Sequence, residues 1–380
     1  MVKISIIHFQ PLEYFPPALN FVRYLSGQDK FLVSVATTRQ ANQPFRLEIG
    51  GKTKVNIFDM SNYQARSRFG RALRYIGFIF ATVRQILNSK PDVIVYFDPY
   101  SAWPAIIYCM IFNRRVRLWI HFHEYFAPEW YSQGMLIARV AHYLETRYAF
   151  DRAIGISQTN SDRVRLFLDD HPSVDGSKLF AFPNYPPSSW GQSHRRIDEL
   201  AGPTKFVALG SLTLKGTYLG EFCEWVHQQN GAVELDVYSL YFDEETKNFL
   251  HSLNSLWIRF HPKGIPYDQI PELFTESAFH VGLVLYRCDH VNTIHCVSNK
   301  VFEYLVCGLD VWYPREMVGT TAYATNGIYP KVLPVDFNNL DELQPEMALS
   351  RDGHSYLRRD FNCELVNSDW VEKLTGFEGN

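Results

Sequence analysis

The sequence predicts an α/β protein built from two doubly wound, Rossmann-like parallel-sheet domains. The chain has 380 residues, which is more than one hydrophobic core usually accommodates. Apolar strand-like runs alternate with helical stretches in both halves, as in a parallel sheet covered by helices. Hydrophobic residues make up 46% of the chain and charged residues 20%, which is enough apolar material for dense cores.

The first half contains five expected strands. They cover residues 2–8, 31–36, 93–97, 116–121 and 152–156. Before Pro91, apolar side chains recur at steps of three and four residues: Phe69, Leu73, Ile76, Phe80, Val83 and Leu87. This period places them on one face of a helix, and we expect that face to pack on the sheet.

A turn-rich stretch at residues 183–189 separates the halves, because its prolines lack amide donors and fix their own backbone angle. The second half has expected strands at residues 206–209, 235–239, 257–260, 279–285 and 310–313, and expected helices at residues 219–228, 244–253, 267–274 and 298–306. We therefore expect an N-terminal domain at residues 1–185 and a C-terminal domain at residues 186–350. A helical segment at residues 351–380 follows, with packing back on the N-terminal domain as one option.

Charge and cysteine content argue against several classes of protein. The formal net charge is −3, so the total charge indicates no nucleic-acid partner. The six cysteines form no Cys-x-x-Cys pair and no zinc-site spacing, which is typical of buried thiols in a reducing compartment. Residues 2–9 form a strand-like run rather than a secretion signal, and the most apolar helical segments are too short to span a bilayer. We expect a cytoplasmic protein.

A glycine loop from Gly210 to Gly216 is the first candidate for binding a ligand. It lies directly between an expected strand and an expected helix. Glycines at Gly210 and Gly216 let the backbone approach a phosphate, the helix start offers free amides, and Lys215 adds a positive charge. A glycine turn with a lysine after a strand is common, so the loop needs a second feature to support it.

A second polar loop begins at His295 and leads into a helix that stops at Gly308. Ser298 is a candidate N-cap for this helix. Glu303 falls inside the helix, where its carboxylate can accept both hydroxyls of a ribose if the helix start points into a ligand cleft. The alternative is an ordinary capping or surface glutamate.

The same residues resemble a known family. Ser298, Asn299, Lys300 and Glu303, followed by Gly308, are similar to the Pro-Asn-Lys-Leu-Phe-Glu-Tyr-x-x-x-Gly signature of group 1, family 4-like glycosyltransferases of the GT-B fold. Residues 210–216 resemble the family's Gly-x-Leu/Ile loop with its Lys-Gly pair, and residues 121–124 resemble its His-Glu strand end. The resemblance covers roughly residues 90–315 and therefore implies two facing Rossmann-like domains.

The resemblance implies a glycosyltransferase that takes a sugar from a UDP- or GDP-linked donor and needs no further cofactor. In the C-terminal domain it implies these donor-binding residues: Gly210, Ser211, Lys215, Gly264, Ile265, His295, Ser298, Asn299, Lys300 and Glu303. In the N-terminal domain it implies an acceptor site with these candidate catalytic residues: Glu13, His121, His123 and Glu124. The expected acceptor is a glycan or lipid-linked glycan of polysaccharide or glycoconjugate synthesis.

Two positions depart from the family pattern. His295 stands where the first Glu of the family's Glu, seven residues, Glu motif contacts the sugar ring, which puts the identity of the donor sugar in doubt. The arginine that often accompanies the loop lysine is missing near Ser211, which removes one of two charges on the leaving diphosphate. Lys300, His290 or another basic side chain could compensate.

The sequence contains no Asp-x-Asp metal signature, and a lysine with helix-start amides can stabilise a leaving diphosphate. We therefore expect metal-independent transfer. The resemblance favours retention of anomeric configuration, whereas an inverting enzyme would need a base in the N-terminal domain. His8, Glu13, His123 and Glu124 are the positions for such a base.

Residues 61–90 form a basic, aromatic stretch without acidic residues. Arginines there that could contact anionic lipid headgroups are Arg66, Arg68, Arg71 and Arg74. Such contact would place the protein at the inner face of the cytoplasmic membrane. The alternative is a solvated helix face beside an ordinary core stripe.

Two other functions remain open at this point. A nucleotide-sugar epimerase of GT-B fold would use the same donor site without an acceptor groove. A non-catalytic nucleotide-sugar-binding protein would account for His295 and for the missing arginine.

Overall fold

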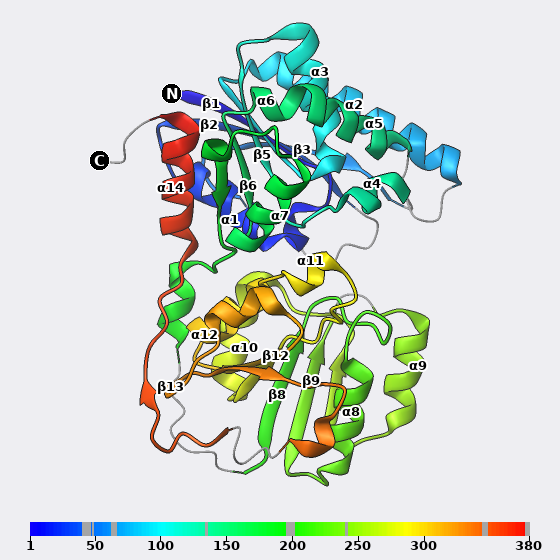
Figure 1. Ribbon diagram of the computed structural model, residues 1–380, viewed down its shortest axis with the longest axis vertical. Coiled ribbons are helices and arrows are strands. Elements are labelled where there is room, and N and C mark those ends of the chain that lie inside the picture. The colour runs from blue at the N-terminus through cyan, green and yellow to red at the C-terminus, as the bar shows by residue number, and fades with distance from the viewer. Residues whose placement is uncertain are drawn as a thin grey trace. The chain divides into compact units, whose positions relative to one another are not determined.

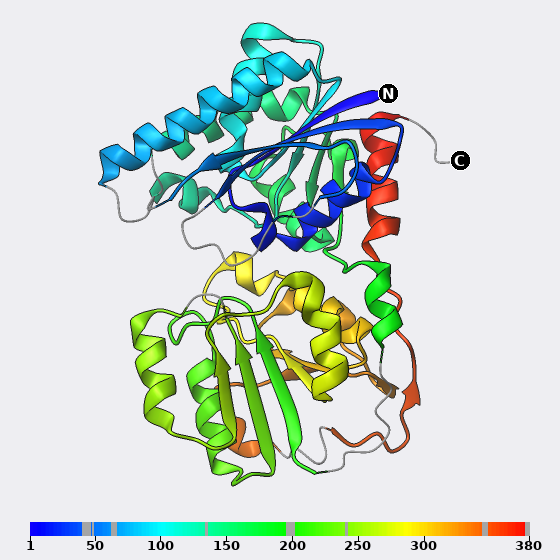
Figure 2. The same ribbon diagram turned by 180° about the vertical axis from the view of Figure 1, so that it is seen from behind.

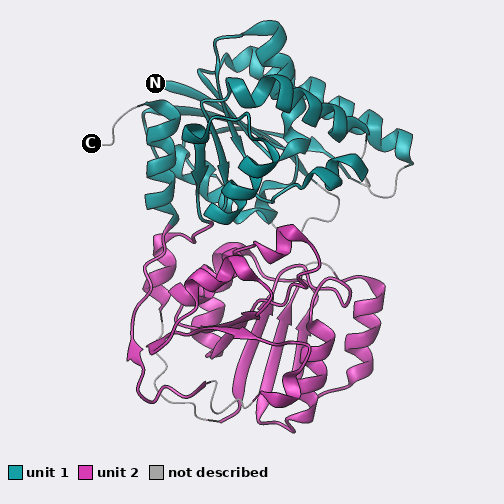
Figure 3. Ribbon diagram, viewed as in Figure 1, with its two compact units in different colours: residues 1–183, 363–380 teal, residues 184–362 magenta. Residues whose placement is uncertain are grey.

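The fold is described from a computed structural model. It describes residues 1–39, 47, 49–61, 67–133, 136–194, 202–239, 242–343 and 349–376. The chain forms two compact units, of which unit 1 comprises residues 1–183 and 363–380 and unit 2 residues 184–362 (Figure 3). Arg66, one of the four arginines expected to contact lipid, lies outside the described residues.

Within the described residues of unit 1, seven parallel strands form one sheet in the order β3-β2-β1-β4-β5-β6-β7 (Figure 1). The strands are β1 (Val2–His8), β2 (Phe31–Arg39), β3 (Lys54–Asp59), β4 (Val93–Phe97), β5 (Arg117–His121), β6 (Gly155–Gln158) and β7 (Leu179–Ala181). The strand order reverses between β1 and β4, which pair directly. Loops that leave such a switch point diverge and open a crevice at the carboxyl ends of the strands.

Helices cover both faces of this sheet. One face carries α2 (Arg68–Ser89), α3 (Ala102–Ile107), η3 (Tyr108–Phe112), α5 (Leu136–Leu144), η4 (Glu145–Ala149), α6 (Phe150–Arg152) and α7 (Ser161–Asp170), whose buried side chains share one core cluster. The other face carries α1 (Pro16–Ser26) and the C-terminal helix α14 (Cys363–Thr375), which share a second cluster. Trp370 of α14 stacks on Phe21 of α1, with ring centroids 4.0 Å apart. Shorter elements are η1 (Leu12–Tyr14), η2 (Pro99–Ser101), α4 (Pro128–Gln133) and η5 (Gly176–Lys178).

Helix α2 packs on the sheet through a different stripe from the expected one. Ser67 caps the helix by accepting a hydrogen bond from the amide of Gly70. Its buried side chains are Tyr75, Phe78, Ile79, Thr82, Val83 and Ile86. The expected stripe was wrong in its first four members, which are exposed: Phe69, Leu73, Ile76 and Phe80. The helix carries two apolar stripes with the same period, and the period alone cannot tell which one faces the sheet.

Within the described part of unit 2, six parallel strands form a sheet in the order β10-β9-β8-β11-β12-β14. They are β8 (Thr204–Leu209), β9 (Val233–Tyr238), β10 (Ile258–His261), β11 (Val281–Leu283), β12 (Asp310–Pro314) and β14 (Val332–Val335). Here the order reverses between β8 and β11. A short pair, β13 (Ile328–Tyr329) with β15 (Ser355–Tyr356), lies beside this sheet.

Helices in the described part of unit 2 are α8 (Leu219–Gln228), α9 (Glu244–Leu253), α10 (Ile270–Ser277), α11 (Val291–Ile294) and α12 (Asn299–Val306), with short turns η6 (Ser188–Ser193), η7 (Tyr267–Gln269), η8 (Val318–Tyr323) and η9 (Leu340–Glu342). Two expected elements differ in extent. A strand was expected at residues 152–156, but β6 begins only at Gly155. The strand expected at residues 279–285 is the shorter β11.

Candidate functional site

One candidate site lies in unit 2, where β8 and β11 meet at the switch point. Helix α12 is held close to β11 because Gly282 has no side chain: a Cβ there would lie 2.2 Å from the ring of Tyr304. Ser298 caps α12 by accepting a hydrogen bond from the amide of Lys300. The loop after β11 therefore delivers the start of α12 to the carboxyl end of the sheet.

Lys300 lies directly against the glycine loop. Gly210 follows β8 with a φ of 119°, and a Cβ at this position would come within 2.8 Å of Cε of Lys300. Glycine is needed here for both the backbone angle and the space. The structure thus brings together two predicted donor-binding residues that are 90 positions apart, Gly210 and Lys300.

Glu303 lies one helical turn beyond Lys300 and is only 3% exposed. The side-chain amide of Asn299 donates a hydrogen bond to its Oε1. Burial raises the pKa of Glu303, although the Lys300 cation and the Asn299 bond oppose the rise. Burial lowers the pKa of Lys300, but attraction to Tyr286 and Glu303 outweighs this and leaves the pKa above its ordinary value. A cation and a carboxyl group are therefore coupled on α12.

Lys215 is not part of this pair. Its side chain is 82% exposed and forms an ion pair with Glu245 of α9 at 3.1 Å. Among the described residues no contact joins Lys215 to Glu303. The cation that the structure places against Gly210 is Lys300, which the sequence analysis gave both as a donor-binding residue and as a compensating charge.

The remaining predicted donor residues lie in loops at the same edge of the sheet. Ser211 is exposed just after Gly210. Gly264, with a φ of 58°, closes a turn after β10 by donating a hydrogen bond to the carbonyl of His261 at 3.0 Å. Ile265 follows and packs on the core of unit 2. His295 ends α11, and its carbonyl lies so close to Gly319 that a Cβ on the glycine would be 2.6 Å away.

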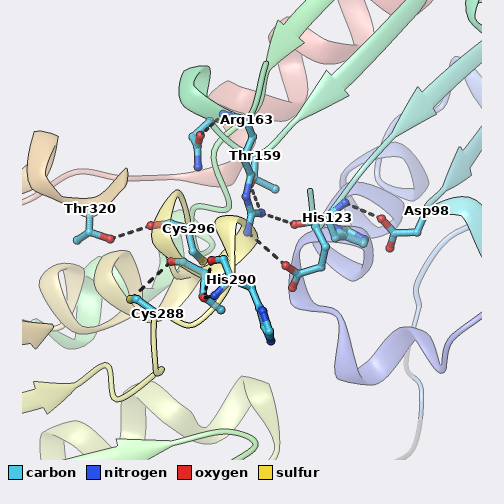
Figure 4. A network of polar contacts seen from close by, with 11 residues as sticks. Asp98, His123, Thr159, Arg163, Cys288, His290, Cys296 and Thr320 are labelled. Carbon is cyan, nitrogen blue, oxygen red and sulfur yellow. Dashed lines mark hydrogen bonds and ion pairs between the residues drawn. The ribbon is translucent and has the colours of Figure 1, made fainter. Parts of the chain in front are cut away.

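The loop that contains His290 is internally bonded, as Figure 4 shows. Its turn is closed by the amide of Thr293 donating to the carbonyl of His290 at 2.9 Å. The hydroxyl of Thr320 donates to the carbonyl of Cys296 at 3.0 Å. These bonds fix the backbone between β11 and α12, on which the position of Lys300 depends.

A separate candidate site lies in unit 1, at the carboxyl ends of β1, β4 and β5. Three buried histidines gather there: His8, His121 and His123. The ring of His123 is 5.5 Å from that of His8 and 5.0 Å from that of His121, and it stacks on Phe97 at 5.0 Å. The sequence had singled out each histidine, but only the sheet topology shows that they form one cluster.

Burial keeps these histidines neutral. It lowers the pKa of His8 to about 4 and that of His121 to about 3, and it lowers the pKa of His123 well below its ordinary value. Nδ1 of His8 bonds the carbonyl of Gln10 at 2.7 Å, and Nδ1 of His121 bonds the hydroxyl of Ser157 at 2.8 Å. Within the described chain, neither ring nitrogen of His123 has a hydrogen-bond partner. A buried imidazole without a partner can accept or donate a bond to a ligand.

Asp98 joins this cluster and was missed by the sequence analysis. It follows β4 with φ 58° and ψ 162°, a conformation that is rare outside glycine and marks local strain. Its Oδ1 accepts a hydrogen bond from the amide of His123 at 2.8 Å (Figure 4). Burial raises the pKa of Asp98 to about 8, although this bond opposes the rise. A carboxyl group directly after a buried strand was the available sequence signal.

Glu124 is positioned by a buried arginine. Arg163 of α7 is 2% exposed and donates hydrogen bonds to the carbonyl of His123 at 2.7 Å and to the hydroxyl of Thr159 at 2.9 Å (Figure 4). Its other terminal nitrogen pairs with the half-exposed Glu124 at 3.2 Å. Arg163 was not anticipated, because it lies at an ordinary helix position. Glu13 lies in η1, in the loop after β1, and no contact among the described residues joins it to the histidines.

A comparison with known protein families finds a match in the first part of the chain. Residues 18–173 match the family Glycosyltransferase Family 4. The match includes Asp98, His121, His123 and Glu124, whereas the donor loops proposed for unit 2 lie beyond it. The predicted resemblance to family 4 glycosyltransferases is thereby confirmed.

Solved structures agree on the fold of the whole chain. Anabaena HepE in complex with UDP-glucose is 14% identical, with a TM-score of 0.66 over 99% of this chain and 100% of that chain. OtsA in its apo form is 12% identical, with a TM-score of 0.68 over 100% of each chain. UDP-GlcNAc 2-epimerase from Neisseria meningitidis, bound to UDP-GlcNAc, is 11% identical, with a TM-score of 0.63 over 99% of this chain and 100% of that chain. No curated protein sequence matches the chain.

The chain therefore has the GT-B fold, as the sequence predicted. The family match at residues 18–173 supports a glycosyltransferase. In the described ranges, no group of three or more His, Cys, Asp or Glu side chains could hold a metal ion. No described helix is both long enough and apolar enough to cross a membrane.

Proposed function

We propose that the chain transfers a hexosyl group from a UDP- or GDP-linked donor to an acceptor hydroxyl, without a metal ion and with retention of configuration. The observation that carries this proposal is the position of Lys300 over Gly210, with Glu303 one turn further along α12. Breaking the bond between sugar and diphosphate gathers negative charge on the leaving oxygen. A lysine and the amides of a helix start, placed together, are suited to stabilise that charge.

The proposed donor site assigns a separate role to each group on α12. Lys300 contacts the diphosphate, and Glu303 accepts hydrogen bonds from the ribose hydroxyls. Gly210 and Ser211 let the phosphates approach the backbone, and the turn at Gly264 lies against the base. Lys215 reaches the diphosphate only by leaving Glu245, so we give it the minor share of the charge.

The proposed acceptor site is the histidine cluster of unit 1. A neutral His123 with two unpartnered ring nitrogens can hold a hydroxyl of the transferred sugar or of the acceptor. Asp98 orients His123 by accepting the hydrogen bond from its backbone amide, and the ion pair with Arg163 positions Glu124. The acceptor that we propose is a glycan or lipid-linked glycan, used at the inner face of the cytoplasmic membrane.

A calorimetric titration with UDP, GDP, uridine and guanosine tests the donor site. Lys300→Met removes the charge at nearly constant volume, so it should weaken binding of the diphosphate roughly tenfold or more and leave nucleoside binding unchanged. Glu303→Gln should weaken both, because the ribose is common to them. Lys247→Met is the matched control, since Lys247 is an exposed lysine of the same unit paired with Glu244. Unchanged diphosphate affinity in Lys300→Met would sink the assignment.

Product analysis separates this function from its alternatives. A transferase incubated with donor alone releases free sugar slowly, whereas an epimerase returns an isomerised nucleotide sugar. Binding of the donor without turnover across a panel of acceptors would indicate a non-catalytic protein. The family 4 match at residues 18–173 favours transfer over the other two outcomes.

A further inference from the structure

Exposed apolar side chains are concentrated in three segments of unit 1. Seventeen large hydrophobic side chains are exposed among the described residues, and ten of them belong to α2, η3 and α5. The three segments have 22, 5 and 9 residues, so together they contain 36 of the 380 residues. Exposed apolar residues scattered singly are normal, but a concentration of this kind marks an interaction surface.

The longest part of this surface is the second apolar stripe of α2. Phe69, Leu73, Ile76 and Phe80 follow one another at steps of four, three and four residues. They lie roughly a third of a turn away from the stripe that packs on the sheet. Phe69 is 74% exposed and Phe80 is 71% exposed, so both rings project into solvent.

The other two segments belong to the same helical layer. Helix η3 continues α3 and ends in the exposed side chains of Ile111 and Phe112. Helix α5 presents Leu136 and Tyr143 and is joined to α3 by the Trp103 indole, which donates to the carbonyl of Ile137 at 3.0 Å. All three segments contribute to the core cluster on one face of the sheet, where Figures 1 and 2 show α2, α3 and α5 together.

The charges around this surface are of one sign along α2. The helix carries four arginines, Arg68, Arg71, Arg74 and Arg84, and no acidic residue. Arginines also follow η3, at positions 114 and 115, and lie on α5 at position 139. A surface that combines projecting aromatic rings with a basic border is complementary to anionic headgroups over an acyl layer.

We propose that α2, η3 and α5 form a docking surface for a leaflet of anionic phospholipid. Phe69, Phe80 and Phe112 enter the boundary between headgroups and acyl chains, and the arginines bind the headgroup phosphates. This inference deepens the proposed function, because it names the surface through which the enzyme reaches a lipid-linked acceptor. Only the link to a lipid-linked acceptor rests on the proposed function, because binding to lipid requires neither a donor nor an acceptor.

Vesicle co-sedimentation of the full chain tests the proposal in the absence of sugar nucleotides. Vesicles of phosphatidylcholine alone are compared with vesicles that also contain phosphatidylglycerol, at low and at high salt. The test variants are Phe69→Ser with Phe80→Ser, and Arg71→Ser with Arg84→Ser. The matched controls are Leu256→Ser with Leu365→Ser, two apolar side chains exposed outside the surface, and Arg165→Ser, an exposed arginine of α7.

The proposal expects binding to phosphatidylglycerol vesicles that weakens with salt and falls at least about tenfold in both test variants, with the controls unchanged. Nucleotide binding should be retained in all variants, which separates this result from a failure of the donor site. Absence of vesicle binding would overturn the proposal, as would binding that the phenylalanine variant leaves intact. A dimer that dissociates in the phenylalanine variant and does not bind vesicles would assign the surface to a second copy of the chain.

Discussion

Replacing Gly210 with alanine tests the contact on which the proposed donor site depends. The new Cβ would lie 2.8 Å from Cε and 3.2 Å from Nζ of Lys300, so the lysine must move. If it loses a charge-assisted hydrogen bond to the diphosphate, the cost is about 1.5 to 3 kcal/mol, or roughly ten- to hundredfold in affinity. The backbone angle of 119° adds a separate penalty of about 1 to 3 kcal/mol, which falls on folding stability.

Two measurements separate these effects. Calorimetry with UDP or GDP reports the affinity, and urea denaturation reports the free energy of unfolding. Gly327→Ala is the control, because Gly327 also has a positive φ, of 70°, but nothing lies within 4 Å of its added Cβ. The control should lose stability without losing affinity.

A double-mutant cycle decides whether the effect passes through Lys300. Once Lys300→Ala has removed the side chain, Gly210→Ala should cost little further affinity. Two results would refute the reasoning: nucleotide affinity equal to the parent in Gly210→Ala, or full additivity of the two substitutions.

Three further predictions concern unit 1. His8→Asn should reduce the pH dependence of stability between pH 6.5 and 4. The unfolded histidine binds a proton that the folded one does not, so His8 alone costs the parent on the order of 3 kcal/mol as the pH falls through this window, measurable by urea denaturation. The loss due to His121 and His123, whose pKa values burial also lowers, should remain in the variant. Asp98→Asn should act in the opposite sense, because a raised pKa makes the folded carboxyl costly to ionise; stability of the parent should fall from pH 6.5 to 8, and that of the variant should not. Trp370→Ala should cost about 3 to 5 kcal/mol by thermal or urea denaturation, against little change for the exposed Leu365→Ala on the same helix; a small loss for Trp370 would mean that α14 contributes little to the core.

The sequence predicted the central strands of both sheets and one edge strand, β10, but it missed the edge strands β3, β7 and β14. Among the described residues, each of these three has only one neighbouring strand. An edge strand is buried less completely, and no position of β3 is fully buried. β14 also carries Pro334, which a sequence rule assigns to a turn but an edge strand tolerates. Hydrophobic runs identify strands that are covered on both faces and bordered on both sides.

The residues of the candidate sites were also predicted only in part. Motif order along the chain identified α12, the glycine loop and the histidine strand ends, because each has its own local pattern. The contact between Lys300 and Gly210 depends on how α12 packs on β11, through Gly282 and Tyr304. No local sequence pattern predicts this packing. Asp98 escaped notice because its importance lies in a backbone angle rather than in a motif.

The C-terminal helix determines when unit 1 can finish folding during synthesis. Unit 1 is completed by residues 363–380, which leave the ribosome only after all of unit 2 has been made. Until then the rings of Phe21, Phe182 and His121 lack their contact with Trp370. During synthesis, the core of the N-terminal unit therefore stays incomplete on the face that α14 later covers. We expect the unit to depend most on chaperones in this state. A fragment that ends at residue 183 would remain in this condition permanently.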